Sequence, residues 1–167
     1  SKPILFICNV DESSVIEGNE YSKRVEALAK TLEASTLNIS VSIEQELSEI
    51  SDENELKEFL FEMGMGSTGL EKLIKTGYDL LGLCTYFTSG PKETRAWTIT
   101  NSTFAPEAAG KIHTDFKKGF IRAETVSYSD FVSAGGWLKA KELGNVRSEG
   151  KDYLVKDGDI MNFLFSS

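Results

Sequence analysis

The 167-residue sequence predicts an α/β module over residues 1–82, followed by an α+β module over residues 83–167. The first module begins with a strand, a helix and a second strand, which is a βαβ half-unit. From Leu83 onward the apolar pattern changes to a period of two, as in antiparallel strands. The charge balance also changes, from −9 over residues 1–82 (7 Lys and Arg against 16 Asp and Glu) to +1 over residues 83–167 (11 against 10). Such a step predicts two modules with different partners.

The overall composition is that of an ordinary globular protein, with 40% hydrophobic and 26% charged residues. No apolar run is near the length needed to cross a bilayer, and no charged leader with a cleavage site is present, so we expect no membrane association. Cys8 and Cys84 each lie in an apolar, strand-like run, which favours buried thiols over a disulfide. Free thiols indicate a reducing compartment, and we expect the cytoplasm.

The first module contains two expected strands with a helix between them. Residues 2–9 form a continuous apolar run, which predicts a strand buried on both faces, as in the middle of a parallel sheet. Asn19 is a suitable N-cap for a helix over residues 20–34, and residues 36–41 give the second strand. A central strand needs neighbours on both sides. We therefore expect the chain to be the last part of a larger α/β domain whose earlier strands are absent from it.

Residues 44–82 predict helices. Asp52 begins one of them, which ends near Gly64, and Thr68 caps another over residues 69–81. The many acidic residues here lack a histidine and lack regular ligand spacing, so they indicate a solvated face and no metal site.

A polar segment, Asn9-Val10-Asp11-Glu12, directly follows the first strand, where open parallel sheets bind ligands. In P-loop GTPases this place carries Asn-Lys-x-Asp, whose aspartate accepts both N–H groups of the guanine edge. Here Glu12 replaces the aspartate and Val10 the lysine, so the site should read guanine poorly and accept adenine. The simpler alternative is a loop without a ligand. Residues 40–44 predict a companion backbone loop, and the expected base contacts are Asn9, Val10, Glu12, Ser40, Val41 and Ser42.

The second module predicts the inventory of a β-grasp fold, which is five short strands and a crossing helix. Asp157-Gly158 lies between two apolar runs and predicts that the last two strands form a hairpin. A short helix over residues 106–109 should end at Gly110, and two further helical pieces should begin near residues 129 and 138. The expected strands cover residues 84–88, 94–99, 119–127, 153–155 and 160–165.

A basic stretch, residues 105–124, holds cations interleaved with Phe116 and Phe120. Two interpretations stand equally: an RNA-facing surface, or a solvated turn with both phenylalanines in the core. The near-neutral balance of residues 83–167 argues against tight general binding of nucleic acid, and we expect no DNA partner. The candidate contacts to RNA or a protein partner are Lys92, Arg95, Lys111, His113, Lys117, Lys118 and Arg122.

Three long motifs carry a family resemblance: YFTSGPKETRAWTI at residues 86–99, APEAAGKIHTDF at residues 105–116 and KGFIRAE at residues 118–124. With them the sequence resembles the YchF / Obg-like ATPase family over nearly its whole length. The resemblance implies that residues 1–82 are the last part of a P-loop nucleotide-binding G domain and that residues 83–167 are a TGS domain, a ubiquitin-like β-grasp. It also implies binding of ATP, or more weakly GTP, with Mg²⁺ in the full-length parent, and association with ribosomal RNA or protein.

The sequence departs from the family in lacking a G-x-x-x-x-G-K-[ST] motif, so nothing in it can cradle phosphates or hold Mg²⁺. We therefore expect no catalytic residue, no cofactor and no nucleotide hydrolysis for this chain alone. The alternative functions are a stand-alone RNA-binding or regulatory module and, with the least support, an enzyme using His113 with Asp115, or Cys84. Trp137, which follows two glycines, is expected to be exposed and to mark a partner surface.

Overall fold

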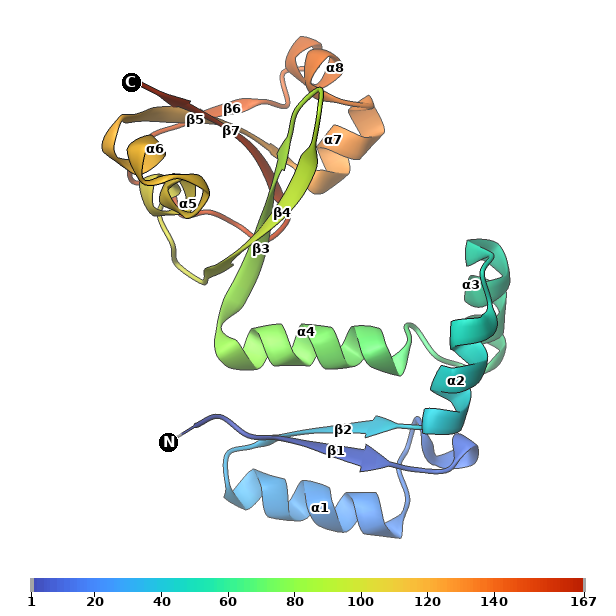
Figure 1. The fold of residues 1–167 in the computed structure, drawn as a ribbon. Helices are drawn as coiled ribbons and strands as arrows, with labels where there is room; N and C mark the ends of the chain where they lie inside the picture. Colours follow the sequence, from blue (N-terminus) through green and yellow to red (C-terminus); the bar gives the residue numbers. More distant parts are fainter. Residues whose placement is uncertain (1, 167) are drawn as a thin grey trace. The chain divides into compact units, whose positions relative to one another are not determined.

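The computed structural model describes residues 2–166, and the chain divides into two compact units, Ser1–Leu81 and Gly82–Ser167. Each unit is described by itself below, with the elements labelled in Figure 1. Among the described residues, no helix is both long and apolar enough to cross a membrane.

The first unit contains a two-stranded parallel sheet of β1 (Leu5–Asn9) and β2 (Ser35–Ile39), in which Leu5 pairs with Ser35 and Asn9 with Ile39. Helix α1 (Glu20–Thr31) connects the two strands and packs beside them (Figure 1). Asn19 caps α1 as predicted, because its side chain accepts hydrogen bonds from the next helical N–H groups. The helix ends three residues earlier than predicted, since Glu33 adopts a left-handed φ of 52°.

Strand β1 is not buried on both faces, so that prediction is wrong for this structure. Ile7 in the strand is 50% exposed, and Ile4, just before the strand, is 47% exposed. The reason is that β1 has β2 as its one strand neighbour within residues 2–166. Part of the apolar face of α1 is also uncovered, because Leu28 and Leu32 are each more than half exposed.

Three further α-helices and a short 3₁₀ helix, η1 (Glu12–Ser14), complete the first unit; the α-helices are α2 (Val41–Glu49), α3 (Glu53–Glu62) and α4 (Gly69–Leu81). Asp52 caps α3 and Thr68 begins α4, both as predicted. Residues 40–44 were expected to form a loop, but helix α2 already begins at Val41, with Ser40 as its N-cap. Burial of Ile43 and Leu47 in the core explains this difference, because the two residues lie one helical turn apart and pack together with Leu60.

The second unit is built on a five-stranded mixed sheet in the order β4-β3-β7-β5-β6. Strand β3 runs parallel to β7, and the other neighbours are antiparallel. Helices α5 (Ala105–Ile112) and α6 (Thr114–Lys118) lie together in Figure 1, and α7 (Tyr128–Ala134) and α8 (Trp137–Glu142) lie together elsewhere along the sheet. The strands are β3 (Leu83–Ser89), β4 (Thr94–Thr100), β5 (Phe120–Ser127), β6 (Arg147–Glu149) and β7 (Asp159–Phe165).

The core of the second unit contains Tyr86, which is fully buried. Its hydroxyl donates a hydrogen bond of 2.8 Å to the carbonyl of Ala108 in α5, which fastens the helix to the sheet. Burial raises the pKa of Tyr86 far above its usual value, so this hydroxyl stays protonated.

The predicted hairpin of the last two strands is wrong. Leu154 forms an isolated bridge with Phe104, and the fifth strand is β6, which pairs with β5. Asp157 and Gly158 instead form hydrogen bonds with strand β3. The Thr85 N–H donates to Asp157 Oδ1, and the Gly158 N–H donates to the Thr85 carbonyl, each at a distance of 2.8 Å. Tertiary contacts to a strand 72 positions away therefore override the local turn signal.

The expected helix end at Gly110 is also wrong, because α5 continues to Ile112. A Cβ at Gly110 would lie 3.2 Å from the Cβ of Lys117. The glycine therefore permits the close approach of α6 to α5 and does not end the helix.

Candidate functional sites

The predicted base-site residues meet where β1 and β2 end. Oδ1 of Asn9 accepts a hydrogen bond of 3.2 Å from the backbone N–H of Val41. Oε1 of Glu12 accepts one of 3.1 Å from the hydroxyl of Ser42. The partners lie 32 and 30 positions apart in the sequence, so the parallel pairing of the strands brings the two segments together. All four residues are exposed at this edge.

The other two predicted base contacts are buried. Ser40 is 1% exposed, and its hydroxyl lies 3.0 Å from that of Ser42. Val10 is 8% exposed and packs in the core with Val15 and Ile43, so its side chain is not available at the edge. A valine after a strand carries no signal that separates a core position from a ligand contact, which explains why the sequence placed it at the site.

Glu44 is a positioning residue that the sequence analysis missed. Its two carboxylate oxygens accept hydrogen bonds from the N–H groups of Gly69 (2.7 Å) and Leu70 (3.0 Å), at the start of α4. A negative charge is stabilising at a helix N-terminus, and here it comes from another helix. A Cβ at Gly69 would lie 2.7 Å from Glu44 Oε1, so the glycine allows the approach. Glu44 thereby joins α2 to the start of α4.

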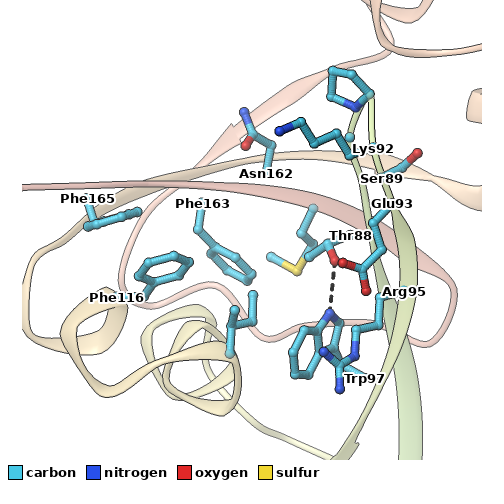
Figure 2. A pocket seen from close by; sticks show the side chains of 14 residues that line it. Thr88, Ser89, Lys92, Glu93, Arg95, Trp97, Phe116, Asn162, Phe163 and Phe165 are labelled. Carbon is cyan, nitrogen blue, oxygen red and sulfur yellow. Dashed lines mark hydrogen bonds between the residues drawn. The ribbon is translucent and has the colours of Figure 1, made fainter.

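The second candidate site is a cleft of about 670 Å³ in the second unit (Figure 2). Its aromatic lining includes Phe116 and Phe165, whose rings stack with centroids 3.9 Å apart. Trp97 donates from Nε1 to the hydroxyl of Thr88 at 2.9 Å, which fixes the indole ring. The guanidinium of Arg95 lies 4.3 Å from the centroid of that ring, within cation–π range.

The predicted cationic contacts do not form one surface. Lys92 and Arg95 line the cleft. Lys111, Lys117 and Lys118 surround a different shallow pocket on α5 and α6, and Arg122 lines a third beside Ser148. The sequence interleaves these residues within one stretch, but the change from helix to strand at Gly119 separates Arg122 from the lysines.

Several of these cations already have partners. Lys117 Nζ lies 3.3 Å from Glu107, Lys118 Nζ lies 3.9 Å from Asp115, and Arg122 donates to Ser148 over 3.1 Å. Near Arg122, a hydrogen bond from Lys141 lowers the pKa of Glu124, so this carboxylate stays charged. Among residues 2–166, the structure shows no ion pair for Lys92, Arg95 or Lys111.

His113 is a helix cap. Its Nδ1 accepts a hydrogen bond of 3.2 Å from the backbone N–H of Asp115 at the start of α6, and lies 3.4 Å from the Asp115 carboxylate. Both side chains are more than 60% exposed, on a helix turn and not inside a cleft. The other candidate nucleophile, Cys84, is buried, and burial raises the pKa of its thiol, which disfavours the reactive thiolate.

We expect His113→Ala to destabilise the second unit by about 1 kcal/mol, because the N–H of Asp115 loses its acceptor. His113→Asn should restore most of the loss, since asparagine is a good N-cap. Urea unfolding followed by tryptophan fluorescence measures this, because both tryptophans, Trp97 and Trp137, lie in the second unit. Equal stabilities for the alanine and asparagine variants would contradict the capping role.

Trp137 is not an exposed partner residue, so that prediction is wrong. It is half-buried, its Nε1 donates to the carbonyl of Ser89 at 2.8 Å, and its ring packs edge-to-face on Phe131 with centroids 5.4 Å apart.

Within residues 2–166, no group of three His, Cys, Asp or Glu side chains could hold a metal ion.

The family model YchF-GTPase_C, described as "Protein of unknown function (DUF933)", matches residues 83–166, which is half of the chain. The chain belongs to the YchF family. It corresponds to the C-terminal part of YchF proteins.

Relatives in the YchF family are similar over both units. The "Ribosome-binding ATPase YchF" of Escherichia coli O157:H7 is 50% identical over 165 residues, which cover 99% of this chain and 45% of the relative. That of Bacillus subtilis is 48% identical over 168 residues, covering 99% and 46%. The chain thus spans less than half the length of these YchF relatives.

A solved YchF structure has the same fold. The YchF GTPase of Schizosaccharomyces pombe matches with a TM-score of 0.77 and 32% identity, over 97% of this chain and 43% of that one. A GTP-binding protein from Pyrococcus horikoshii matches with a TM-score of 0.64 at 18% identity, which shows similarity of fold alone. The mixed α/β architecture is therefore that of YchF proteins.

Proposed function

We propose that this chain is the C-terminal part of a cytoplasmic, ribosome-binding nucleotide hydrolase. The first unit supplies the base-recognition edge of a P-loop G domain, and the second is a TGS domain of the β-grasp type. The supporting observation is the joining of Asn9 to Val41 and of Glu12 to Ser42 at the carboxyl ends of two parallel strands. For the second unit, the support is a mixed five-stranded sheet with a helix following its first hairpin.

The exposed edge fits a purine base. Glu12 presents a carboxylate of which one oxygen is used by Ser42, and the other can accept from an exocyclic amino group such as that of adenine. Val41 is 59% exposed beside it and offers an apolar surface for the face of the base. ATP, or GTP more weakly, is therefore the proposed nucleotide. Its phosphates and Mg²⁺ would require a P-loop, which this sequence does not contain.

We further propose that the second unit contacts the ribosome through the lysine patch of α5 and α6, which is Lys111, Lys117 and Lys118. Lys117 and Lys118 are only weakly held, because both side chains are more than half exposed in their ion pairs. Phosphates can therefore replace Glu107 and Asp115 as their partners. Arg122 lies in a different pocket and is not needed for this contact.

The experiment is co-sedimentation of the chain with purified ribosomes from about 50 to about 300 mM KCl. Replacing all three patch lysines by alanine should weaken binding and flatten the salt dependence, lowering the slope of log K against log salt by about 2 to 3. A matched variant replaces three exposed lysines elsewhere in the same unit, Lys139, Lys151 and Lys156, and should bind like the parent. Equal losses in both variants would contradict the proposed patch, and no sedimentation of the parent at any salt would contradict docking by this chain.

A further inference from the structure

The cleft of Figure 2 is an opening within the sheet, where two neighbouring parallel strands part. Strands β3 and β7 are paired at one position, Phe87 with Ile160. Beyond it, Thr88 and Ser89 line one side of the cleft, and Phe163 and Phe165 line the other. The two strands therefore leave facing backbone edges unpaired with each other.

The hydrogen-bonding pattern of β7 shows which of its backbone groups face the cleft. The N–H of Tyr128 donates to the carbonyl of Gly158, just before β7. Hydrogen-bonded positions alternate in an antiparallel pair, so from Gly158 onward every second residue of β7 bonds to β5. Ile160, Asn162 and Leu164 point their backbone groups toward β5. Phe163 and Phe165 consequently point their N–H and C=O groups away from β5, into the cleft. Among residues 2–166, β7 pairs with β3 at Ile160 alone, so these two N–H groups have no ladder partner on that side.

The opposite edge of the cleft is partly closed. At the two ends of the β3–β4 ladder, the Asn101 N–H donates to the Gly82 carbonyl and the Gly90 N–H donates to the Glu93 carbonyl. Because hydrogen-bonded positions alternate along an antiparallel strand, the backbone groups of Ser89 point away from β4 and toward β7. The Ser89 carbonyl is already used, because it accepts from the indole of Trp137. The open edge is therefore that of β7.

We propose that this cleft binds an extended segment of a partner protein, which adds a strand to β7 at Phe163 and Phe165. Donors and acceptors at strand spacing are complementary to a polypeptide backbone, and main-chain hydrogen bonds of this kind supply affinity in strand addition. Unpaired backbone groups facing an apolar cleft also gain more from a partner than exposed ones do.

The side chains of the cleft specify the partner further. Alternate residues of an added strand point to the same face, so apolar side chains would reach the floor formed by Trp97 and Phe116. Lys92 and Arg95 line the cleft together with one acidic residue, Glu93, and neither cation forms an ion pair within residues 2–166. An acidic side chain in the partner strand would complement this excess of positive charge. The partner segment is therefore extended, alternately apolar, and carries an acidic residue.

The first test is hydrogen exchange of the backbone amides by NMR in the full chain. Without any ligand, the Phe163 and Phe165 N–H groups should exchange at least about tenfold faster than those of Asn162 and Leu164. Equal protection of all four amides would show that the β7 edge is already paired and would overturn the proposal.

The second test adds an acetylated octapeptide of alternating threonine and valine that carries one aspartate. The Phe163 and Phe165 amides should then slow at least about tenfold, because they become paired. Two control peptides carry N-methyl groups on one or the other set of alternate residues, and only the set facing β7 should lose binding. Backbone pairing tolerates most sequences, so this peptide should bind if the proposal is right. No protection of these amides at saturating peptide would therefore overturn the proposal, and so would equal binding of both methylated peptides.

Charge reversal tests the rim. Arg95→Glu should weaken binding of the aspartate-containing peptide at least about tenfold. The matched control, Lys139→Glu on α8, should leave the binding of this peptide unchanged. This proposal concerns a different site from the lysine patch proposed above, so the two proposals fail separately. Loss of ribosome sedimentation tests the lysine patch, whereas amide protection tests the cleft. An oligoribonucleotide that binds here and leaves both amides unprotected would assign the cleft to RNA and overturn strand addition.

Discussion

Replacing Gly119 by alanine should destabilise the second unit by about 3 kcal/mol. Gly119 lies between α6 and β5, and its carbonyl accepts a hydrogen bond of 2.8 Å from the N–H of Ser166. A Cβ added at Gly119 would overlap the carbonyl oxygen of Ser166. Because the overlapping atom belongs to the backbone, it cannot move aside without disturbing the end of β7.

The matched control is Gly150→Ala, at an exposed position where an added Cβ meets nothing within 4 Å. Urea unfolding followed by tryptophan fluorescence compares the two variants, and the difference in midpoint measures the clash. Equal midpoints would mean that the chain relaxes around Ser166 at little cost, and would contradict the rigid connection of β5 to β7 at this end.

Asp159→Ala should also cost about 3 kcal/mol, because two donors lose their shared acceptor. Asp159 is 3% exposed at the start of β7. Its Oδ2 accepts hydrogen bonds from the Tyr153 hydroxyl (2.7 Å) and the Lys156 N–H (2.9 Å), and its Oδ1 lies 3.5 Å from Arg147. Burial, followed by the hydrogen bond to Asp159, raises the pKa of Tyr153 to about 12, so the hydroxyl remains a donor at neutral pH.

Asp159→Asn separates hydrogen bonding from charge. An asparagine Oδ1 in the place of Oδ2 can accept from both Tyr153 and Lys156, and only the attraction to the half-exposed Arg147 is lost. We therefore expect asparagine to cost about 1 kcal/mol, well below alanine. The same urea unfolding measurement compares the stabilities of the two variants. If asparagine lowers the free energy of unfolding as much as alanine does, the charge of Asp159, and not its two hydrogen bonds, stabilises the start of β7.

Local signals predicted the helices of the first unit well. Asn19, Asp52 and Thr68 each begin a helix as expected, because an N-cap uses hydrogen bonds within three residues. The same signals predicted the end of α1 less well, since Glu33 ends it through a backbone conformation that its residue type does not announce.

The sequence likewise predicted one part of the candidate sites and missed another. The order of strands and polar residues predicted that the segments of Asn9 and Ser42 meet, because carboxyl ends of parallel strands lie at one edge. It did not predict that Val10 is buried or that α2 begins at Val41, because both depend on packing against Leu60 and its neighbours. The cleft was also missed, since its lining residues come from β3, β4, α5, α6 and β7, and β7 lies far along the chain from the others.

By itself the sequence determined the two modules, the caps, the βαβ order of the first unit and the membership of the YchF family, since these depend on near neighbours or on long motifs. Only the tertiary structure decided which strand pairs with β5, where Trp137 lies and where β3 parts from β7. Strand pairing and burial depend on contacts between residues far apart in the chain. Asp157-Gly158 shows the difference, because a strong local turn signal there yielded to hydrogen bonds with Thr85.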